Sequence, residues 1–449
     1  MKVCIVGGGG GASNAANVIR RLDKGAQSDI FTDRAEIGNQ PCEIPFVLKG
    51  DLPSWNDTFV FRQKFYSERD INVHLNTEVT EIIRSEKRLI AGGESYSYDK
   101  LILDLGAIPT IPPIPGIDGQ NEFVLTTNLN AARVFEEAIP RHSTAAIIGT
   151  GQIALEVAAV LKARDYERIH LLGRSESLLR AYLDKDMAER VEARVRDKGI
   201  ALILSAKIRS IMSQNGKKML SLPDQELKVD FVFFGTGSRP NIALAQRAGL
   251  EIGETGGILV NEYLQTSDAD IYAIGDCTEN WDAISGWKRL YQTATSAARG
   301  GRIAATNLVR GNVLPYQGTT MPFIMEVFGY QVGTVGFTES YARERGLDVL
   351  SNTTTTATRR RAFGGKTIHI KLVADRKSRT LVGGQILSEE MVAGKVDRLA
   401  VAIAERVPVE RLAVIDTCYS PTVGTAYEPL TMALDELRLK LDNTRYEQV

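Results

Sequence analysis

Lys2-Val3-Cys4-Ile5-Val6-Gly7-Gly8-Gly9-Gly10-Gly11-Ala12 is the stretch that decides the fold. A short apolar run that suits a buried strand leads into glycines with the spacing GxGxxA, and small residues that suit a helix follow from Ser13 to Leu22. Glycines at this spacing permit a tight turn and let backbone N–H groups approach a pyrophosphate at the helix N-terminus. The stretch therefore predicts a Rossmann-like nucleotide-binding unit at the start of the chain.

A second unit of the same kind follows later in the chain. The apolar strand 145–148 leads into Gly149-Thr150-Gly151-Gln152-Ile153-Ala154, again GxGxxA, and then into a helix from Leu155 to Ala163 and a strand from Ile169 to Leu172. Two such units in one chain indicate nucleotide binding far more specifically than a single GxGxxA motif does. They predict two bound nucleotides, and hydride transfer between them is the simplest reason for the pair.

The residues after the second strand of each unit differ. Asp33 follows the strand 29–32 of the first unit, where an acid accepts hydrogen bonds from a ribose. In the second unit the corresponding place is Gly173-Arg174-Ser175, with no acid. Arg174 at that place accommodates a 2′-phosphate and favours NADPH, whereas the nearby Glu176 keeps NADH open.

Length and composition exclude several classes of protein. The chain has 449 residues, 43% hydrophobic and 24% charged, with a formal net charge of -1. These values predict two or three domains and argue against binding to nucleic acid or to a membrane surface. No apolar run approaches the roughly 20 residues of a membrane span, and the N-terminus enters a strand without a signal-peptide pattern. We expect a cytoplasmic enzyme, with no metal site because cysteine and histidine show no ligand spacing.

Cys42 is the cysteine whose surroundings suggest chemistry. The four cysteines, Cys4, Cys42, Cys277 and Cys418, contain no CxxC pair. Cys42 lies about thirty residues after the first glycine loop, in a segment that Pro41 and Pro45 stiffen. Cys4 and Cys277 fall in or beside apolar strands and are expected to be buried small hydrophobes. We therefore interpret Cys42 as a redox thiol.

Other elements are placed by pattern alone. We expect helices over 58–69 and 291–308 and a strand over 271–277, which ends on Gly275-Asp276-Cys277. Asp276 is positioned to hold a ribityl hydroxyl, and the N-terminus of the helix after it is expected to face a flavin ring. The proline-rich 111–116 marks a domain boundary. From about Tyr316 onward strand-like stretches dominate, which predicts an α+β domain.

Taken together, these landmarks resemble the single-cysteine branch of the pyridine nucleotide-disulfide oxidoreductases. That branch includes CoA-disulfide reductases, NAD(P)H-dependent persulfide or polysulfide reductases, NADH oxidases and NADH peroxidases. The matching segments are Val6–Ala16, Cys42–Pro45, Gly149–Glu156, Thr236–Asn241, Tyr272–Asp276, Gly394–Arg398 and Tyr419–Pro421.

The resemblance implies an α/β fold with two Rossmann-like nucleotide-binding domains and a C-terminal α+β dimerisation domain. Its boundaries would be 1–112 with 241–318 for FAD, 113–240 for NAD(P)H and 319–449 for dimerisation. It also implies a homodimer in which Tyr419 reaches the partner's active site and acts near the redox cysteine. Tyr419 and Cys42 are then the expected catalytic residues.

The expected binding residues fall into three groups. FAD is assigned to Gly7, Gly9, Ala12, Asp33, Arg34, Gly106, Asp276, Thr293 and Ala294. NADH or NADPH is assigned to Gly149, Gly151, Ala154, Glu156, Arg174 and Gly237. Coenzyme A is a further candidate ligand, with its phosphates assigned to Arg20, Arg21 and Lys24 at the end of the first helix.

Three positions depart from the family pattern. Gly10 stands where the peroxidases and many oxidases carry a histidine close to the cysteine. Pro41 stands where the CoA-disulfide reductases have an asparagine. Phe363 follows Arg361-Ala362, where a second active-site tyrosine is expected. Gly173-Arg174-Ser175, in contrast, resembles the NADPH-using CoA-disulfide reductases.

The functional hypothesis is an FAD-dependent NAD(P)H oxidoreductase that reduces a CoA disulfide, CoA persulfide or polysulfide through Cys42. The attacking species is a thiolate, and Tyr419 is the expected proton donor to the leaving group. One alternative is an NADH oxidase or peroxidase in which Cys42 cycles through a sulfenic acid. Alternatives of other classes are an electron-transfer reductase for a small redox protein and a redox-sensing flavoprotein.

Overall fold

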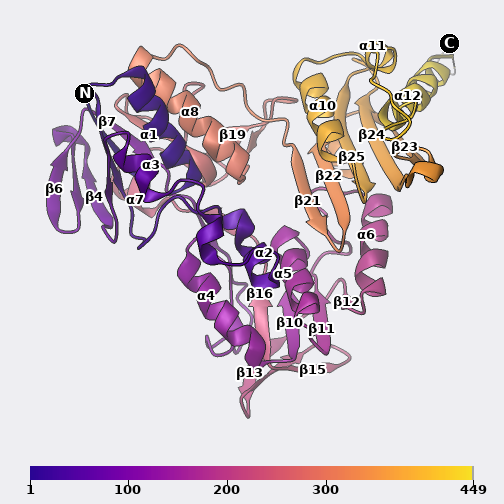
Figure 1. Ribbon diagram of the computed structural model, residues 1–449, viewed down its shortest axis with the longest axis horizontal. Helices are drawn as coiled ribbons and strands as arrows, with labels where there is room; N and C mark the ends of the chain where they lie inside the picture. The colour runs from indigo at the N-terminus through magenta and orange to yellow at the C-terminus, as the bar shows by residue number, and fades with distance from the viewer. Residues whose placement is uncertain (447–449) are drawn as a thin grey trace. The chain divides into compact units, whose positions relative to one another are not determined.

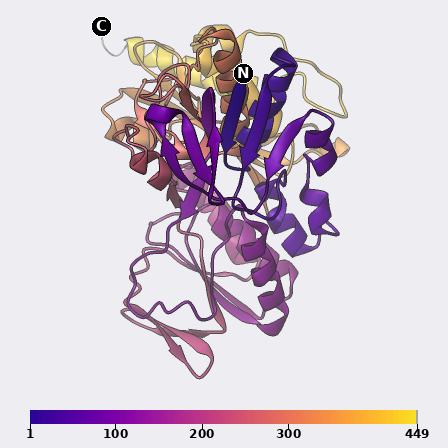
Figure 2. The same cartoon turned by 90° about the vertical axis from the view of Figure 1, so that its left-hand side faces the viewer.

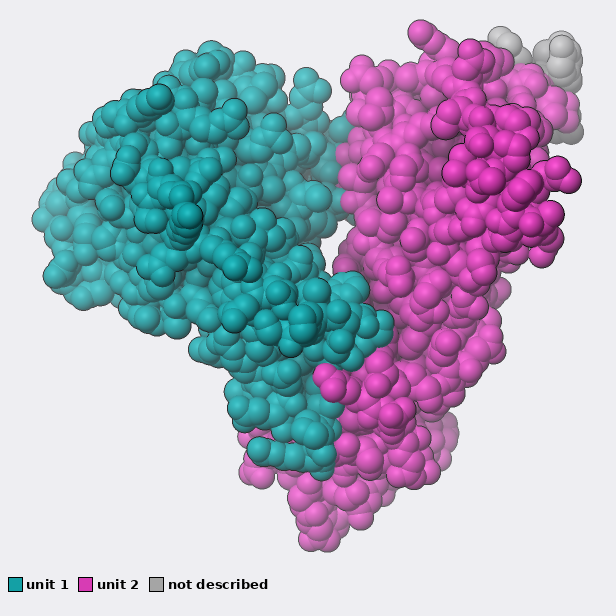
Figure 3. Space-filling model, viewed as in Figure 1, with its two compact units in different colours: residues 1–112, 124–141, 237–319 teal, residues 113–123, 142–236, 320–449 magenta. Residues whose placement is uncertain are grey.

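The computed structural model describes residues 1–446, and the side chains of residues 1–443 (Figure 1). The chain divides into two compact units (Figure 3). Unit 1 contains residues 1–112, 124–141 and 237–319, and unit 2 contains residues 113–123, 142–236 and 320–449. The predicted three-domain boundaries stay a prediction.

Unit 1 is built on a five-stranded parallel sheet whose strand order is β18-β7-β1-β2-β3 (Figures 1 and 2). Its strands are β1 (Lys2–Val6), β2 (Gln27–Phe31), β3 (Ile71–His74), β7 (Lys100–Leu103) and β18 (Ile271–Ala273). The central strand β1 is almost wholly buried because both faces of its sheet are covered, which explains its continuous apolar run.

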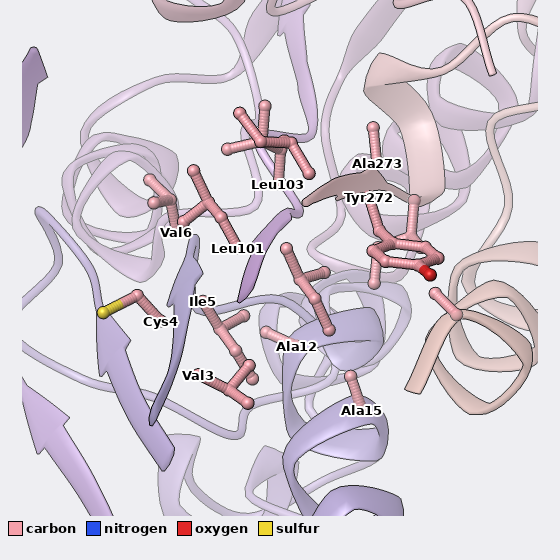
Figure 4. Packing of buried hydrophobic residues seen from close by; sticks show 14 of the residues in the cluster. Val3, Cys4, Ile5, Val6, Ala12, Ala15, Leu101, Leu103, Tyr272 and Ala273 are labelled. Carbon is pink, nitrogen blue, oxygen red and sulfur yellow. The ribbon is translucent and has the colours of Figure 1, made fainter. Parts of the chain in front are cut away.

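Two helices cover one face of this sheet, α1 (Gly10–Leu22) and α8 (Ala294–Arg310). The side chains of Val3 and Ile5 point toward Ala12 and Ala15 of α1, whereas that of Cys4 points to the other face (Figure 4). α1 and α8 lie side by side, and a side chain at Gly301 would lie 2.3 Å from the carbonyl oxygen of Gly11. Small residues on both helices permit this close approach.

The remaining elements of unit 1 surround this core. They are η1 (Pro41–Glu43), α2 (Ile44–Lys49), η2 (Trp55–Thr58), α3 (Gln63–Ser67), β4 (Val79–Ile83), η3 (Arg84–Glu86), β5 (Arg88–Ala91), β6 (Glu94–Ser97), β8 (Ala107–Pro109), α4 (Leu129–Ala138), η4 (Ile139–Arg141), β17 (Ser238–Pro240), α7 (Ala243–Arg247), η5 (Gly275–Cys277), β19 (Asn280–Trp281) and β20 (Lys288–Arg289). Strands β4, β5 and β6 form an antiparallel sheet, and β8 pairs with β17.

Unit 2 contains a second parallel sheet, with the strand order β12-β11-β10-β16-β9. Its elements are β9 (Glu122–Phe123), β10 (Thr144–Ile148), α5 (Gln152–Ala163), β11 (Arg168–Leu172), α6 (Lys185–Asp197), β12 (Ala201–Ile203) and β16 (Phe231–Phe234). An antiparallel ladder of β13 (Ser210–Gln214), β14 (Lys217–Ser221) and β15 (Glu226–Val229) precedes β16.

The rest of unit 2 is an antiparallel sheet with the order β21-β22-β25-β24-β23 and helices packed on it. Its elements are β21 (Phe323–Val327), β22 (Tyr330–Gly336), α9 (Glu339–Glu344), β23 (Val349–Ala357), η6 (Arg361–Phe363), β24 (Thr367–Asp375), β25 (Leu381–Ser388), α10 (Ala393–Ala404), α11 (Val409–Ala413) and α12 (Pro429–Tyr446). The predicted fold class, two Rossmann-like sheets and an α+β domain, is confirmed.

Three predicted elements are corrected by the structure. Residues 58–69 do not form one helix, because the N–H groups of Val60 and Phe61 bond the carbonyl of Gly38 and hold this segment extended. The strand expected over 271–277 ends at Ala273, and Gly275, at φ 72°, begins a 3₁₀ turn. The last helix of unit 1 begins at Ala294, because the Thr293 side chain caps it, and extends to Arg310.

Among the described residues, no helix has the length and apolar character needed to cross a bilayer.

Candidate active site

The first glycine loop connects β1 to α1. Gly7 has φ +114°, and a Cβ there would lie 2.0 Å from the carbonyl oxygen of Asp104, so only glycine fits. At Gly10 no described atom outside the adjoining helix backbone lies within 4 Å of an added Cβ, which leaves open space over the loop. Ala12, the last residue of the motif, is buried and begins the packed face of the helix. The loop therefore offers backbone N–H groups beside an open space, as a diphosphate requires.

Asp104 lies directly against this loop and was missed by the sequence analysis. Its carboxylate Oδ2 accepts a hydrogen bond from the backbone N–H of Ala12 at 2.8 Å. The residue is only 7% exposed, and burial raises the pKa of the Asp104 carboxyl to about 7. A charged residue directly after the apolar strand β7, at the carboxyl edge of the sheet, was the signal that could have found it.

The other residues assigned to FAD lie on four further segments of unit 1. Asp33 is exposed after β2, while Arg34 donates to the carbonyl and hydroxyl of Thr127. Asp276 lies in η5, and its side chain accepts no hydrogen bond from any described residue. Burial raises the pKa of the Asp276 carboxyl to about 6. The remaining positions are Gly106 after β7, Thr293 at the N-cap of α8 and Ala294 at its first turn.

These positions fit a dinucleotide. Asp104 connects the first loop to η5, because its carboxyl contacts Ala12 and a Cβ at Gly275 would lie 2.7 Å from its Oδ1. The loop residues Gly7, Gly9 and Ala12 and the carboxyl of Asp276 are thereby brought to one edge of the sheet. An open glycine loop can hold a diphosphate, and the half-buried carboxyl of Asp276, which accepts no hydrogen bond from the described residues, can hold a sugar hydroxyl.

The predicted redox thiol lies in a tight turn of unit 1. Cys42 is the middle residue of η1 and is exposed, and no disulfide joins any of the four cysteines, all of which are described. Cys4 and Cys277 are fully buried, as expected. Burial raises the pKa of the thiols of Cys4 and Cys277 to about 12, so neither supplies a thiolate near neutral pH.

The segment around Cys42, residues 33–62, is here called the redox loop. Two parts of it are held together on either side of Cys42 and α2, since the N–H of Gln40 bonds the carbonyl of Thr58 at 2.8 Å. Helix α4 holds it from outside, through the ion pair of Arg133 with Glu36 and the bond from Trp55 Nε1 to Glu136 at 2.8 Å. The thiol is thus exposed on a segment that several hydrogen bonds and an ion pair hold in place.

Two buried polar atoms near the thiol in sequence, Nδ2 of Asn39 and Oε2 of Glu43, have no hydrogen-bond partner within the described part of the chain. Burial raises the pKa of the Glu43 carboxyl above its usual value. An amide donor and a carboxyl oxygen that lack protein partners are unusual in a folded protein and indicate where a bound molecule completes the site.

The second glycine loop, in unit 2, connects β10 to α5. Gly149 has φ +140°, and a Cβ there would lie 2.1 Å from the carbonyl oxygen of Gly235. A Cβ at Gly235 would lie 3.0 Å from Ala154, which explains why the last motif residue is small. Gly151 has open space around its Cβ position. The predicted residues Gly149, Gly151 and Ala154 are therefore together and fit a second dinucleotide. The predicted Gly237 belongs to unit 1.

Two side chains beside the second loop bear on the choice of dinucleotide. Arg174 is exposed just beyond β11 and forms no ion pair within the described residues. A Cβ at Gly173 would lie 2.1 Å from Cγ2 of Thr150, so an acid there would clash with the loop. Glu156 on α5 accepts a hydrogen bond from Gln152 at 2.8 Å, while burial raises the pKa of its carboxyl to about 7.

Tyr419 lies in the connection between α11 and α12, and its side chain is 53% exposed. Exposed apolar side chains surround it in sequence, Val414, Ile415, Val423 and Tyr427. Glu428 at the end of this connection pairs with Lys395 at 3.0 Å and caps the start of α12. An anchored connection that exposes several large apolar side chains is typical of a surface that another chain covers.

The three residues assigned to coenzyme A differ in availability. Arg20 donates to the carbonyls of Arg69, Lys24 and Ala26 and pairs with Asp70 at 3.0 Å. The donors of the Arg20 guanidinium are therefore already bonded within unit 1. Arg21 and Lys24 are exposed.

The sequence matches two family models over most of its length. Residues 1–301 match pyridine nucleotide-disulphide oxidoreductase, and residues 324–430 match the dimerisation domain of the same family. The chain belongs to this family. Pyridine nucleotide-disulphide oxidoreductases bind FAD and NAD(P)H, so the chain is an FAD-dependent NAD(P)H oxidoreductase with a dimerisation domain.

The relatives to which the chain is similar include NADH oxidases and enzymes named for the reduction of sulfur compounds. The chain is 32% identical to an NADH oxidase of Methanocaldococcus jannaschii, over 99% of this chain and 100% of that one. It is 31% identical to the CoA-dependent NAD(P)H sulfur oxidoreductase of Pyrococcus furiosus, over 96% and 97%. Among solved structures, the NAD-dependent persulfide reductase from A. fulgidus matches with a TM-score of 0.94 and 30% identity, covering 99% of this chain and 84% of that one.

Proposed function

We propose that this oxidoreductase reduces a CoA-linked disulfide, persulfide or polysulfide with NAD(P)H and FAD, through the single thiol of Cys42. The observation that carries the proposal is the exposure of Cys42 in a tight turn, while Cys4 and Cys277 are fully buried. A lone thiol must exchange with a sulfur that comes from outside the chain. Relatives at about the same identity act on sulfur compounds with coenzyme A.

In this mechanism Cys42 attacks as a thiolate. Its sulfur bonds to one sulfur of the substrate, the substrate S–S bond breaks, and the departing thiolate takes a proton. FAD, when bound, supplies the electron pair from NAD(P)H that reduces the resulting mixed disulfide. Cys42 then returns to the thiolate and the second substrate thiol is released, so two electrons are used for each S–S bond.

We assign the proton transfer to Tyr419 of the second subunit in a homodimer. Support comes from the dimerisation-domain match and from the exposed, apolar connection on which Tyr419 lies. Arg21 and Lys24, both exposed near the end of α1, are the proposed contacts for the phosphates of coenzyme A. Arg20 is left out of this assignment because its donors are already bonded. The proposed location is the cytoplasm.

A second candidate is the oxidase activity for which the M. jannaschii relative is named. There Cys42 would pass through a sulfenic acid. Gly10 offers that species no polar side chain, and the space around its Cβ position is open. The sulfur reaction is favoured for this reason, since it needs no such partner.

The deciding assay is anaerobic NADPH oxidation with CoA persulfide or CoA disulfide, beside oxygen uptake measured without a sulfur substrate. We expect sulfur-dependent turnover that Cys42→Ser abolishes and Cys418→Ser, the other exposed cysteine, retains. Oxygen uptake that equals NADPH loss would establish the oxidase instead. Unchanged turnover of Cys42→Ser with ferredoxin would indicate an electron-transfer reductase.

A further inference from the structure

The carboxyl of Asp104 is the group from which a new property of the FAD site follows. It lies at the carboxyl end of β7, is 7% exposed, and shares the edge of the sheet with the first glycine loop. Its Oδ2 accepts the backbone N–H of Ala12 at 2.8 Å, whereas its Oδ1 makes no hydrogen bond with any residue that the structure describes. One oxygen is therefore fixed to the loop, and the other is available to a molecule bound there.

Three glycines approach this carboxyl closely. Ideal Cβ atoms at Gly9, Gly11 and Gly275 would lie 2.8, 2.9 and 2.7 Å from its oxygens. No side chain at these three positions shields the carboxyl from a molecule bound over the loop. The same N–H groups that would approach a diphosphate therefore have a carboxyl beneath them.

Few titratable or charged groups interact with Asp104, and they come from two neighbouring segments. Asp276 in η5 adds negative charge and the adjoining Cys277 is a neutral thiol, while Arg34 after β2 is the one cation among the described residues that acts on it. Helix α1 contributes the N–H of Ala12. Burial is the largest effect and raises the pKa of the Asp104 carboxyl to about 7.

We propose that Asp104 binds FAD as the neutral acid and donates its proton toward the diphosphate over the glycine loop. Oδ2 keeps the bond from Ala12 in either state, which leaves Oδ1 as the atom that carries the proton. An ionised Asp104 would instead put a buried negative charge beside the diphosphate. Asp104 is thus a positioning residue of the cofactor site. The proposal rests on FAD binding by this family and is independent of the sulfur substrate.

The sign of the pH dependence follows from linkage. The diphosphate adds negative charge near the carboxyl, so the pKa of Asp104 is higher with FAD bound than without it. Between these two pKa values FAD binding takes up a proton. The dissociation constant of FAD therefore rises by up to tenfold per pH unit above about pH 7, and it is constant well below that pH.

Two measurements on the full-length protein test the proposal. After removal of FAD, flavin fluorescence gives the dissociation constant from pH 6 to 9 for the wild type and for Asp104→Asn, which keeps the shape but is neutral throughout. We expect the rise above pH 7 in the wild type and a flat profile in Asp104→Asn. Asp99→Asn is the matched control, because Asp99 is exposed at the opposite end of β7, and it should keep the rise.

Calorimetry of FAD binding at pH 8, in two buffers with different ionisation enthalpies, needs only the wild type. Uptake of close to one proton per FAD is expected. No proton uptake, or the same pH slope in Asp104→Asn as in the wild type, would overturn the proposal. A failure of the sulfur assay would leave both of these measurements unaffected.

Discussion

The guanidinium of Arg133 on α4 pairs with the carboxylate of Glu36 through two contacts, of 2.8 and 3.0 Å. Because Glu36 is six residues before Cys42, this pair connects the redox loop to a helix that follows it by about ninety residues. The Trp55 bond to Glu136 on the same helix adds a second connection. The position of the thiol therefore depends on α4 as well as on its own turn.

Replacement of Arg133 by methionine removes the pair and leaves the aliphatic stem. Since both side chains are partly exposed, the expected loss of stability is small, about 0.2–1 kcal/mol. The clearer effect is local. Amide hydrogen exchange in residues 33–62 should become faster and alkylation of Cys42 easier.

Arg343→Met is the control, because it breaks a similar pair with Glu339 at 2.8 Å in unit 2. It should leave exchange in the redox loop unchanged. Equal exchange of residues 33–62 in Arg133→Met and the wild type would show that α4 does not hold the loop.

The second glycine loop gives a pair of variants with opposite expectations. Gly149→Ala introduces a Cβ 2.1 Å from a carbonyl oxygen at φ +140°, which should cost about 1–3 kcal/mol and lower the midpoint of thermal unfolding. The Cβ of Gly151→Ala meets no atom of the described residues within 4 Å, so this variant should fold normally and raise the KM for NADPH. Thermal unfolding and steady-state kinetics distinguish the two variants. Equal stability of Gly149→Ala and Gly151→Ala would contradict the close approach of Gly149 to the carbonyl oxygen.

The parts of the fold that were predictable depend on local pattern. Periodicity and spacing within short windows predict both glycine loops and the burial of Cys4. They also predict the change to an α+β domain from about Tyr316 onward. The segment 58–69 was not predictable in this way. Val60 and Phe61 suit a helix or a strand, and the pairing with Gly38, more than twenty residues away, decides between them.

The role of Asp104 in the candidate FAD site was likewise not predictable from local sequence pattern. Its sequence context, an aspartate after an apolar strand, indicates only a strand end. Its burial depends on Gly9, Gly11 and Gly275, which come from two other segments. A single sequence carries no signal that these glycines converge on one carboxyl.

Arg174 should set the preference between the two nicotinamide cofactors. Since a charge-assisted hydrogen bond contributes about 1.5–3 kcal/mol, Arg174→Ala should raise the KM for NADPH by about 10–100-fold and leave that for NADH nearly unchanged. Arg168→Ala, at the opposite end of β11, is the control and should change neither. A similar loss with both cofactors in Arg174→Ala would exclude a contact with the 2′-phosphate.

Tyr419 should act across the dimer. Tyr419→Phe should lower kcat with CoA disulfide by about 10²-fold while flavin reduction by NADPH stays unchanged. A mixed dimer of one Cys42→Ser chain and one Tyr419→Phe chain distinguishes the two arrangements. If Tyr419 serves the partner's Cys42, one site is intact and half of the wild-type activity returns. If it serves its own chain, both sites stay defective.

The most direct measurement on the central claim is the mass of the peptide that contains Cys42, taken under non-reducing conditions after incubation with CoA disulfide. Exchange at this thiol predicts an increase by the mass of coenzyme A on Cys42, and its loss when NADPH is added to the FAD-loaded protein. An unmodified Cys42, or an adduct confined to Cys418, would contradict the assignment of Cys42 as the redox thiol.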